Sequence, residues 1–172
     1  MSEMTVVALD AMGGDNAPGE MIKGAVEAVR KRSDMKVLLV GKQDLIEEAL
    51  AGYTYPKEQI EVVHASEVIE TAEPPVLAIR RKKDSSLVKA MQLVKNKEAD
   101  ALVSAGSSGA ILVGGQVLVG RIPGVNRAPL APLIPTAKGM SLLIDCGANV
   151  DARPAHLVQF AKMGSIYMEH VI

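Results

Sequence analysis

The stretch Thr5-Val-Val-Ala-Leu-Asp-Ala-Met-Gly-Gly-Asp-Asn-Ala-Pro18 decides the fold. Residues 5–9 form a short, mostly apolar run, which is typical of a strand buried on both faces. Residues 11–19 are rich in Gly, Asp, Asn and Pro and therefore predict a loop. Residues 20–32 then repeat apolar side chains at helical spacing. A strand, a loop and a helix in this order form the basic unit of a parallel α/β sheet.

The same order recurs along the rest of the chain. Further strands are predicted at residues 36–40, 59–64, 101–104, 130–134 and 140–145. Further helices are predicted at residues 44–50, 74–82, from a cap at Asp84 or Ser85 to about residue 97, 110–119 and 154–171. Prolines interrupt the strand at residues 130–134, so we place it at an edge. The pattern predicts an α/β fold, a parallel-rich sheet with helices on both faces.

The composition limits the classes of function. The 172 residues suffice for one domain, or two small ones, with a real core. A hydrophobic content of 48% and a net charge of −1 exclude intrinsic disorder and a general nucleic-acid binder. One Cys and three His are too few for a disulfide framework or a zinc cluster, and they fit a reducing cytoplasm. The first residues lack the pattern of a signal peptide.

Charge is distributed unevenly along the chain. There are 19 basic and 20 acidic residues, 39 in all; 31 lie in residues 1–100 and eight in residues 101–172. We therefore expect the second part to be an assembly surface, with the helix at residues 110–119 buried between layers or at a dimer contact. The uncharged run 101–120 is long enough to span a membrane, but its five Gly and three Ser favour a strand, a loop and a buried helix.

Three loops of unusual composition follow predicted strands, at residues 10–18, 104–110 and 145–153. Because ligands of parallel sheets bind at the carboxyl ends of the strands, we expect the three loops to converge. The first loop matches neither the dinucleotide pattern nor the P-loop. Its paired Gly13 and Gly14 let backbone N–H groups approach an anion, although a tight turn is an equally good interpretation.

The second loop is the better candidate for phosphate. Small residues and three hydroxyls precede a predicted helix, which makes a cradle for phosphate. These residues are Ser104, Gly106, Ser107, Ser108 and Gly109. The alternative is a Gly-rich crossing point packed against another helix, a role that better suits Gly114 and Gly115.

The third loop offers Asp145, Cys146, Asn149 and Asp151. Two carboxylates and one amide are too few to indicate a metal. Cys146 has no local His to activate it, so we interpret it as a small buried thiol rather than a nucleophile. His156 follows the loop, and a lone His of this kind is more often structural.

Two groups of cations could bind anions. The run of Arg80, Arg81, Lys82 and Lys83 is either a solvated helix face or a site for phosphate or an acidic protein surface. Arg127 is one of only five basic residues after residue 100, so we expect it to have an anionic partner.

Five motifs occur in order: Asp10-Ala-Met-Gly-Gly-Asp-Asn-Ala-Pro18, Arg81-Lys-Lys-Asp-Ser-Ser86, Ala99-Asp-Ala-Leu-Val-Ser-Ala-Gly106, Asp145-Cys-Gly-Ala-Asn149 and Gln159-Phe-Ala-Lys-Met-Gly164. Together they closely resemble the bacterial phosphate acyltransferases of phospholipid synthesis (the PlsX type), over essentially the whole chain. The resemblance implies transfer of a fatty acyl group from acyl carrier protein to inorganic phosphate. The acyl phosphate would pass to a membrane-bound glycerol-3-phosphate acyltransferase.

The resemblance also implies a cytoplasmic homodimer with peripheral membrane association, no cofactor, and a fold similar to phosphotransacetylases and isocitrate-type dehydrogenases. Members of the family are roughly twice as long, so residues 1–172 form either a single α/β domain or the N-terminal portion of a longer α/β enzyme. The family usually has Asn-Thr-Gly where this chain has Ser107-Ser108-Gly109. The lost amide should weaken a ligand contact.

Phosphate can attack the thioester directly, so the chemistry needs a held phosphate and fixed donors for the developing oxyanion. We assign catalytic roles to Asp15, Asn16 and Asn149, with the loop of residues 13–16 at the oxyanion or thioester end. Substrate or phosphate binding is assigned to Gly13, Gly14, Ser104, Gly106, Ser107, Ser108, Gly109 and Arg127. Carrier-protein contact is assigned to Arg80, Arg81, Lys82 and Lys83, and no metal is expected.

Two other functions remain open at this point. One is a phosphate acetyl- or butyryltransferase that acts on coenzyme A thioesters. The other is a non-catalytic half that dimerises or binds carrier protein. A nicotinamide dehydrogenase is a distant third, because the sequence has no dinucleotide fingerprint.

Overall fold

The computed structural model describes residues 4–172, which form two compact units. The first unit ends at Val119 and the second runs from Gly120 to Ile172.

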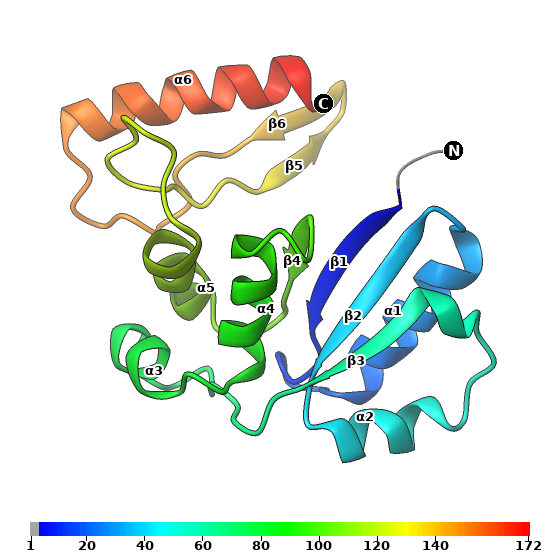
Figure 1. Cartoon of the computed structure of the whole chain (residues 1–172). Coiled ribbons are helices and arrows are strands. Elements are labelled where there is room, and N and C mark those ends of the chain that lie inside the picture. The colour runs from blue at the N-terminus through cyan, green and yellow to red at the C-terminus, as the bar shows by residue number, and fades with distance from the viewer. Residues whose placement is uncertain (1–3) are drawn as a thin grey trace. The chain divides into compact units, whose positions relative to one another are not determined.

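The first unit contains a four-stranded, wholly parallel sheet (Figure 1). Its strands are β1 (Thr5–Asp10), β2 (Met35–Gly41), β3 (Ile60–His64) and β4 (Ala101–Val103), in the order β3-β2-β1-β4. The chain builds outward from β1 to β3 and then crosses back to place β4 on the other side of β1. The border between β1 and β4 is therefore the point where the strand order reverses, which is where ligands of such sheets bind.

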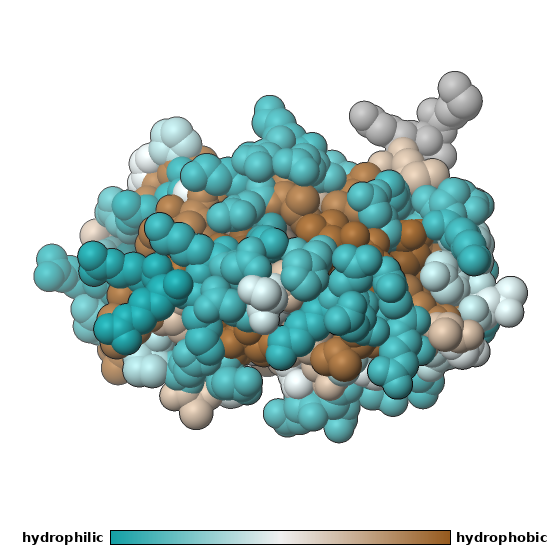
Figure 2. Space-filling model, turned by 60° about the horizontal axis from the view of Figure 1, so that its bottom comes forward, coloured by the Kyte–Doolittle hydropathy of each residue, from teal (hydrophilic) through white to brown (hydrophobic). Residues whose placement is uncertain are grey.

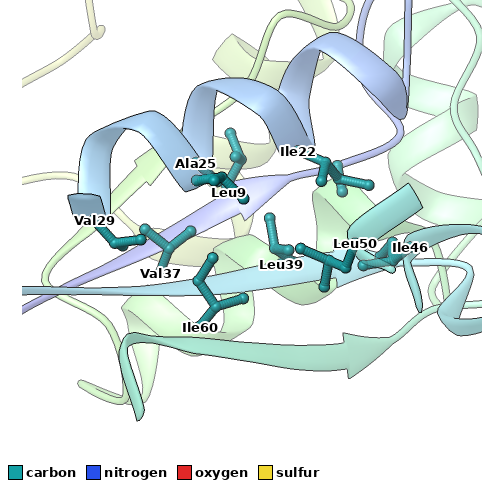
Figure 3. Close-up of a cluster of buried hydrophobic side chains, with 11 residues drawn as sticks. Leu9, Ile22, Ala25, Val29, Val37, Leu39, Ile46, Leu50 and Ile60 are labelled. Carbon is teal, nitrogen blue, oxygen red and sulfur yellow. The ribbon is translucent and has the colours of Figure 1, made fainter. Parts of the chain in front are cut away.

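Helices cover both faces of this sheet, as the sequence predicts. They are α1 (Gly19–Lys31), α2 (Gln43–Leu50), the 3-10 turn η1 (Lys57–Gln59), α3 (Pro75–Arg81), α4 (Ser86–Lys95), α5 (Ser108–Gly114) and the π-helical turn η2 (Gly115–Val119). Successive strand residues alternate between the two layers. Leu9 and Leu39 pack against α1 and α2 (Figure 3), whereas Ala8 and Leu38 belong to the cluster that contains Ala90 of α4. Burial on both faces explains why the strands have no polar alternation.

The second unit has a different kind of sheet, and here the sequence-based prediction was wrong. The residues predicted as an edge strand and a further strand of the parallel sheet instead form an antiparallel pair, β5 (Leu133–Thr136) and β6 (Gly139–Leu142). Only two residues separate these strands, and a parallel connection needs a crossover of a dozen residues or more. Gly139, with φ of +138°, helps the chain to reverse. Helix α6 (Pro154–His170) completes the unit and starts at a proline, as predicted.

Exposed apolar side chains are concentrated in the second part of the chain. Of the 20 exposed large hydrophobic residues, 15 lie from Val103 onward. Between its many hydrophilic residues, the face in Figure 2 also shows hydrophobic surface. The helix predicted at residues 110–119 is not buried between layers in its second half, because η2 buries no residue and Val117 is 68% exposed. Its burial at a dimer contact stays a prediction. The expected assembly surface stays a prediction. Among the described residues, none of the helices combines the length and the hydropathy needed to cross a membrane.

Asp84, in the turn before α4, ties this turn to the segment after β3. Its carboxylate accepts hydrogen bonds from the Ser66 backbone N–H (2.9 Å) and hydroxyl, and it pairs with Lys89 (2.7 Å). The Lys89 ammonium, followed by the two Ser66 donors, holds the pKa of Asp84 well below its usual range. A lowered pKa in the folded state stabilises the fold above the unfolded value of about 3.9, and that contribution is lost as the pH falls below it.

We therefore expect the free energy of unfolding to fall less steeply below about pH 4 in Asp84→Asn than in the unchanged chain. Urea unfolding midpoints measured from pH 6 to pH 2.5 check this. Asp44→Asn is the control, because Asp44 makes no ion pair with another described residue. Identical pH dependence of Asp84→Asn and the unchanged chain would contradict the prediction.

Candidate functional site

The loops that follow β1 and β4 meet at the reversal point of the sheet. Asp10 ends β1, and its Oδ2 accepts a hydrogen bond from the Ser104 hydroxyl across 94 residues of sequence (2.7 Å). Asp10 Oδ1 accepts from the Met12 N–H (3.2 Å), and the Ser104 Oγ accepts from the Gly106 N–H (3.1 Å). Asp10 is only 3% exposed. The predicted convergence of the first two loops is therefore confirmed.

Both glycines of the first loop disfavour a side chain, Gly13 because of close contacts and Gly14 because of its backbone conformation. A Cβ on Gly13 would lie 2.6 Å from Asp10 Oδ2 and 2.9 Å from both the Gly106 N and the Ser104 Oγ. Gly14 has φ of +101°, and a Cβ there would lie 3.1 Å from the Ala105 Cβ. Close approach between the loops is thus the physical reason for Gly13, and the positive φ is the main reason for Gly14.

The second loop both caps a helix and forms a packing point. The Ser107 Oγ accepts a hydrogen bond from the Ala110 N–H (3.3 Å), and Ser107 is 6% exposed, so it is the N-cap of α5. A Cβ on Gly109 would lie 2.7 Å from Cγ of Pro75, at the start of α3. Gly114 likewise leaves room for Met91 and Ile79. Gly109 and Gly114 therefore allow close packing against neighbouring helices, as the alternative interpretation of this Gly-rich segment expects. This packing does not exclude a ligand role of the loop.

Backbone donors remain open in both loops. The N–H groups of six residues make no hydrogen bond with any residue in the described range 4–172. They belong to Gly14, Asp15 and Asn16 in the first loop and to Ser107, Ser108 and Gly109 in the second. Such donors, set at the carboxyl ends of two neighbouring strands, can hold a tetrahedral anion. The side chains of Asp15 and Asn16 are exposed, and Ser108 is exposed as well.

Asp10 is the residue to which sequence reasoning gave no role. Its side chain is the only carboxylate of the first unit that is fully buried among the described residues, and it joins the two loops. The available signal was an acidic residue placed at the end of an apolar strand and followed three residues later by Gly13. Burial of a charged group demands partners, and here they come from both loops.

The third loop lies in the second unit, where it is held by its own hydrogen bonds. Asp145 accepts from the Leu130 N–H (2.6 Å) and the Asn149 N–H (2.7 Å). The Asn149 side-chain amide donates to the Ala128 carbonyl (3.1 Å), and Asn149 is 8% exposed. Asn149 thus organises its loop, while its catalytic role and the placing of this loop beside the other two stay predictions. Cys146 is half-buried, not buried as expected.

Arg127 has an anionic partner, as expected, and it is a carboxylate of the same unit. Its guanidinium donates to both oxygens of Asp151, at 2.8 and 3.4 Å. The hydrogen bond and charge of Arg127 hold the pKa of Asp151 below its usual range. His156 is structural: its Nδ1 accepts from the Arg153 N–H (3.1 Å) at the start of α6, and its ring lies near that of Phe160.

The basic run divides into one engaged side chain and three exposed ones. Lys82 donates to the Val68 carbonyl (2.7 Å) and pairs with Glu73, whose pKa this ammonium lowers. Arg80, Arg81 and Lys83 are exposed, and none forms an ion pair with another residue in the described part of the chain.

Comparison with solved structures finds the same fold in phosphotransacetylases. The enzyme from Streptococcus pyogenes matches with a TM-score of 0.64 and 14% identity, over 92% of this chain and 51% of the other. The EutD phosphotransacetylase from Staphylococcus aureus matches with the same TM-score and 17% identity, over the same shares of the two chains. These likenesses confirm the predicted α/β fold class.

Sequence comparison gives much closer relatives. A phosphate acyltransferase from Alkaliphilus oremlandii is 55% identical over 96% of this chain and 49% of its own length. Phosphate acyltransferases from Clostridium novyi and Clostridium kluyveri are 49% and 52% identical, and each is covered over 50% of its length. The chain thus spans about half the length of the curated relatives it matches. Because a family model described as "Fatty acid synthesis protein" matches residues 5–172, the chain belongs to that family.

Proposed function

We propose that these residues form the phosphate-holding part of an acyltransferase that moves a fatty acyl group from acyl carrier protein to inorganic phosphate. The observation that carries the proposal is the junction of two donor-rich loops through Asp10 and Ser104, at the reversal point of the sheet. Relatives named phosphate acyltransferase, which are 55% and 49% identical in sequence to this chain, support the proposal. The enzyme would be a longer α/β protein to which residues 1–172 contribute the N-terminal portion.

In this reaction the protein needs to position the reactants and stabilise the oxyanion, and it forms no covalent intermediate. An oxygen of phosphate attacks the thioester carbonyl, the new C–O bond forms, the C–S bond breaks, and the carrier leaves as a thiolate that takes up a proton. Phosphate is already a nucleophile, so no enzyme nucleophile is needed and Cys146 is left out. The open N–H groups of residues 107–109 would hold the phosphate, and those of residues 14–16 the oxyanion. Arg127 would reach phosphate only by sharing or leaving Asp151.

The cellular setting follows from the same proposal. The enzyme would be a cytoplasmic homodimer that touches the membrane peripherally and passes acyl phosphate to a membrane-bound glycerol-3-phosphate acyltransferase. The exposed apolar residues after Val103 are the surface available for such contacts.

The test is an assay of acyl phosphate formation on this chain and on a full-length relative. Each is supplied with inorganic phosphate and either acyl carrier protein or coenzyme A thioesters of the same chain length. We expect the full-length enzyme to prefer the carrier-protein donor. Equal or better turnover of the coenzyme A thioester would favour the acetyl- or butyryltransferase alternative. No acyl phosphate from either donor would refute the proposal.

The phosphate loop can be tested with Ser107→Asp. Aspartate is as good an N-cap as serine, so α5 should keep its cap and the fold its stability. The added negative charge should repel phosphate, and we expect the KM for phosphate to rise at least about tenfold, a change of roughly 1.4 kcal/mol in binding. Steady-state kinetics measure it at the corresponding position of a full-length relative. Because the family usually has Asn there, the relative's own Asn is the uncharged control. An unchanged KM for phosphate would remove this loop from the site.

A further inference from the structure

An apolar groove of about 430 Å³ lies in the first unit, bordered by α3, α4, α5 and η2. Its apolar lining comes from Val76, Ile79, Val88, Val113, Val117 and Leu118. Two of these side chains stand out into solvent: Val76 is 62% exposed and Val117 is 68% exposed. Apolar surface of this kind on either side of a groove is typical of a docking site.

The charges beside the groove all have one sign. Arg80 and Lys83 line it, and no acidic residue does. As described above, Arg80, Arg81 and Lys83 find no carboxylate in the described part of the chain, whereas Lys82 is held by Glu73. Two cations that line an apolar groove and lack intramolecular ion-pair partners, Arg80 and Lys83, favour a ligand that is apolar on one face and acidic on its flanks.

We propose that this groove docks an acidic amphipathic helix of a partner protein. The apolar side chains at every third or fourth position of such a helix would bind in the groove, and its flanking carboxylates would meet Arg80 and Lys83. The identification of the partner as acyl carrier protein rests on the proposed function; the docking mode rests on the groove.

The groove also connects to the phosphate loop. Pro75, which starts α3, packs against Gly109, and α5 continues from that loop into the groove through Val113. From Gly109 to Val117 there are eight residues, which span about 12 Å along a helix. A carrier seated in the groove would therefore hold its thioester within reach of the loop proposed to bind phosphate.

The experiment measures the Kd of this chain for labelled holo-acyl carrier protein by fluorescence anisotropy. Val117→Asp places a carboxylate on an exposed position of the groove, and Arg80→Glu reverses a cation at its rim. Each should weaken binding at least about tenfold, and Arg80→Glu should also reduce the salt dependence. The controls are Val150→Asp, since Val150 is 97% exposed and lies outside the groove, and Lys95→Glu, an exposed cation elsewhere on α4. Both should bind like the unchanged chain.

A second measurement separates this inference from the proposed function. In a full-length relative, Val117→Asp should slow turnover of acyl carrier protein thioesters and leave turnover of a small acyl-pantetheine thioester unchanged. Carrier binding that is absent, or equal in Val117→Asp and the unchanged chain, overturns the docking site even if acyl phosphate forms. Binding of the same variants to anionic lipid vesicles is measured as well. If Val117→Asp and Arg80→Glu weaken vesicle binding but not carrier binding, the docking site is also overturned. Absence of acyl phosphate from every donor, with groove-dependent carrier binding intact, would overturn the proposed function instead.

Discussion

Gly13→Ala should abolish most of the acyl phosphate formation of a full-length relative, with a loss of about 100-fold or more. The added Cβ would lie 2.6 Å from Asp10 Oδ2 and 2.9 Å from the Ser104 Oγ, so one of the two loops must move. A displacement of about 1 Å of positioning groups is enough for a loss of this size. The same overpacking should lower the free energy of unfolding of this chain by about 1–3 kcal/mol, measured by urea unfolding.

A matched control is available within the same unit. Gly24 lies in α1, and nothing stands within 4 Å of where its Cβ would be. Gly24→Ala should therefore leave activity unchanged and raise helix stability by up to about 1 kcal/mol. Should Gly13→Ala behave like Gly24→Ala in both measurements, the tight contact between the loops would have no functional meaning.

Asp10→Ala should have the second large effect, because it removes the link between the two loops. The substitution leaves the Ser104 hydroxyl and the Met12 N–H without their acceptor. An unsatisfied buried donor costs about 1–3 kcal/mol, and these two donors are partly buried, so we expect a fall in the urea midpoint of this chain. In the full-length relative, the KM for phosphate should rise together with a loss of kcat of roughly 100-fold, since both loops lose their register.

Two further variants show whether the effect of Asp10→Ala on stability and activity comes from the lost position of the loops or from the lost charge. Asp10→Asn keeps one oxygen acceptor and should recover part of the activity. Asp100→Ala removes a carboxylate that accepts from the Val6 N–H (2.7 Å) at the opposite, exposed end of the β1–β4 pair, and it should affect stability slightly and kinetics not at all. A drop in stability for Asp10→Ala without any change in the KM for phosphate would assign Asp10 a structural role only.

Much of the first unit could be predicted from the sequence, because its strands are buried on both faces and its helices are amphipathic. Those local patterns depend little on what lies far away in the chain. The second unit was harder. The strands at residues 130–145 have few apolar residues facing a core, and their pairing follows from the two-residue connection rather than from periodicity.

The site divides in the same way. Loop composition and strand ends identified Gly13 and Ser104 as neighbours, because topology alone brings them together. Composition could not show that the Ser107 hydroxyl caps α5 or that Lys82 forms an ion pair with Glu73, since both contacts depend on local side-chain geometry. Asp10 was missed because a carboxylate at a strand end looks like any other loop acid until its burial is known.

The pairing of β1 with β4 also bears on the order of folding events. Strands β1 and β2 are close in sequence, whereas the Asp10–Ser104 hydrogen bond closes a segment of 94 residues. Closing a flexible segment of that size costs about 4 kcal/mol of chain entropy from its length alone. We therefore expect the loop junction to form late in folding, once α1 to α4 are in place. An anion that binds between the loops only in the folded state would stabilise the whole first unit against unfolding, in addition to its part in the reaction.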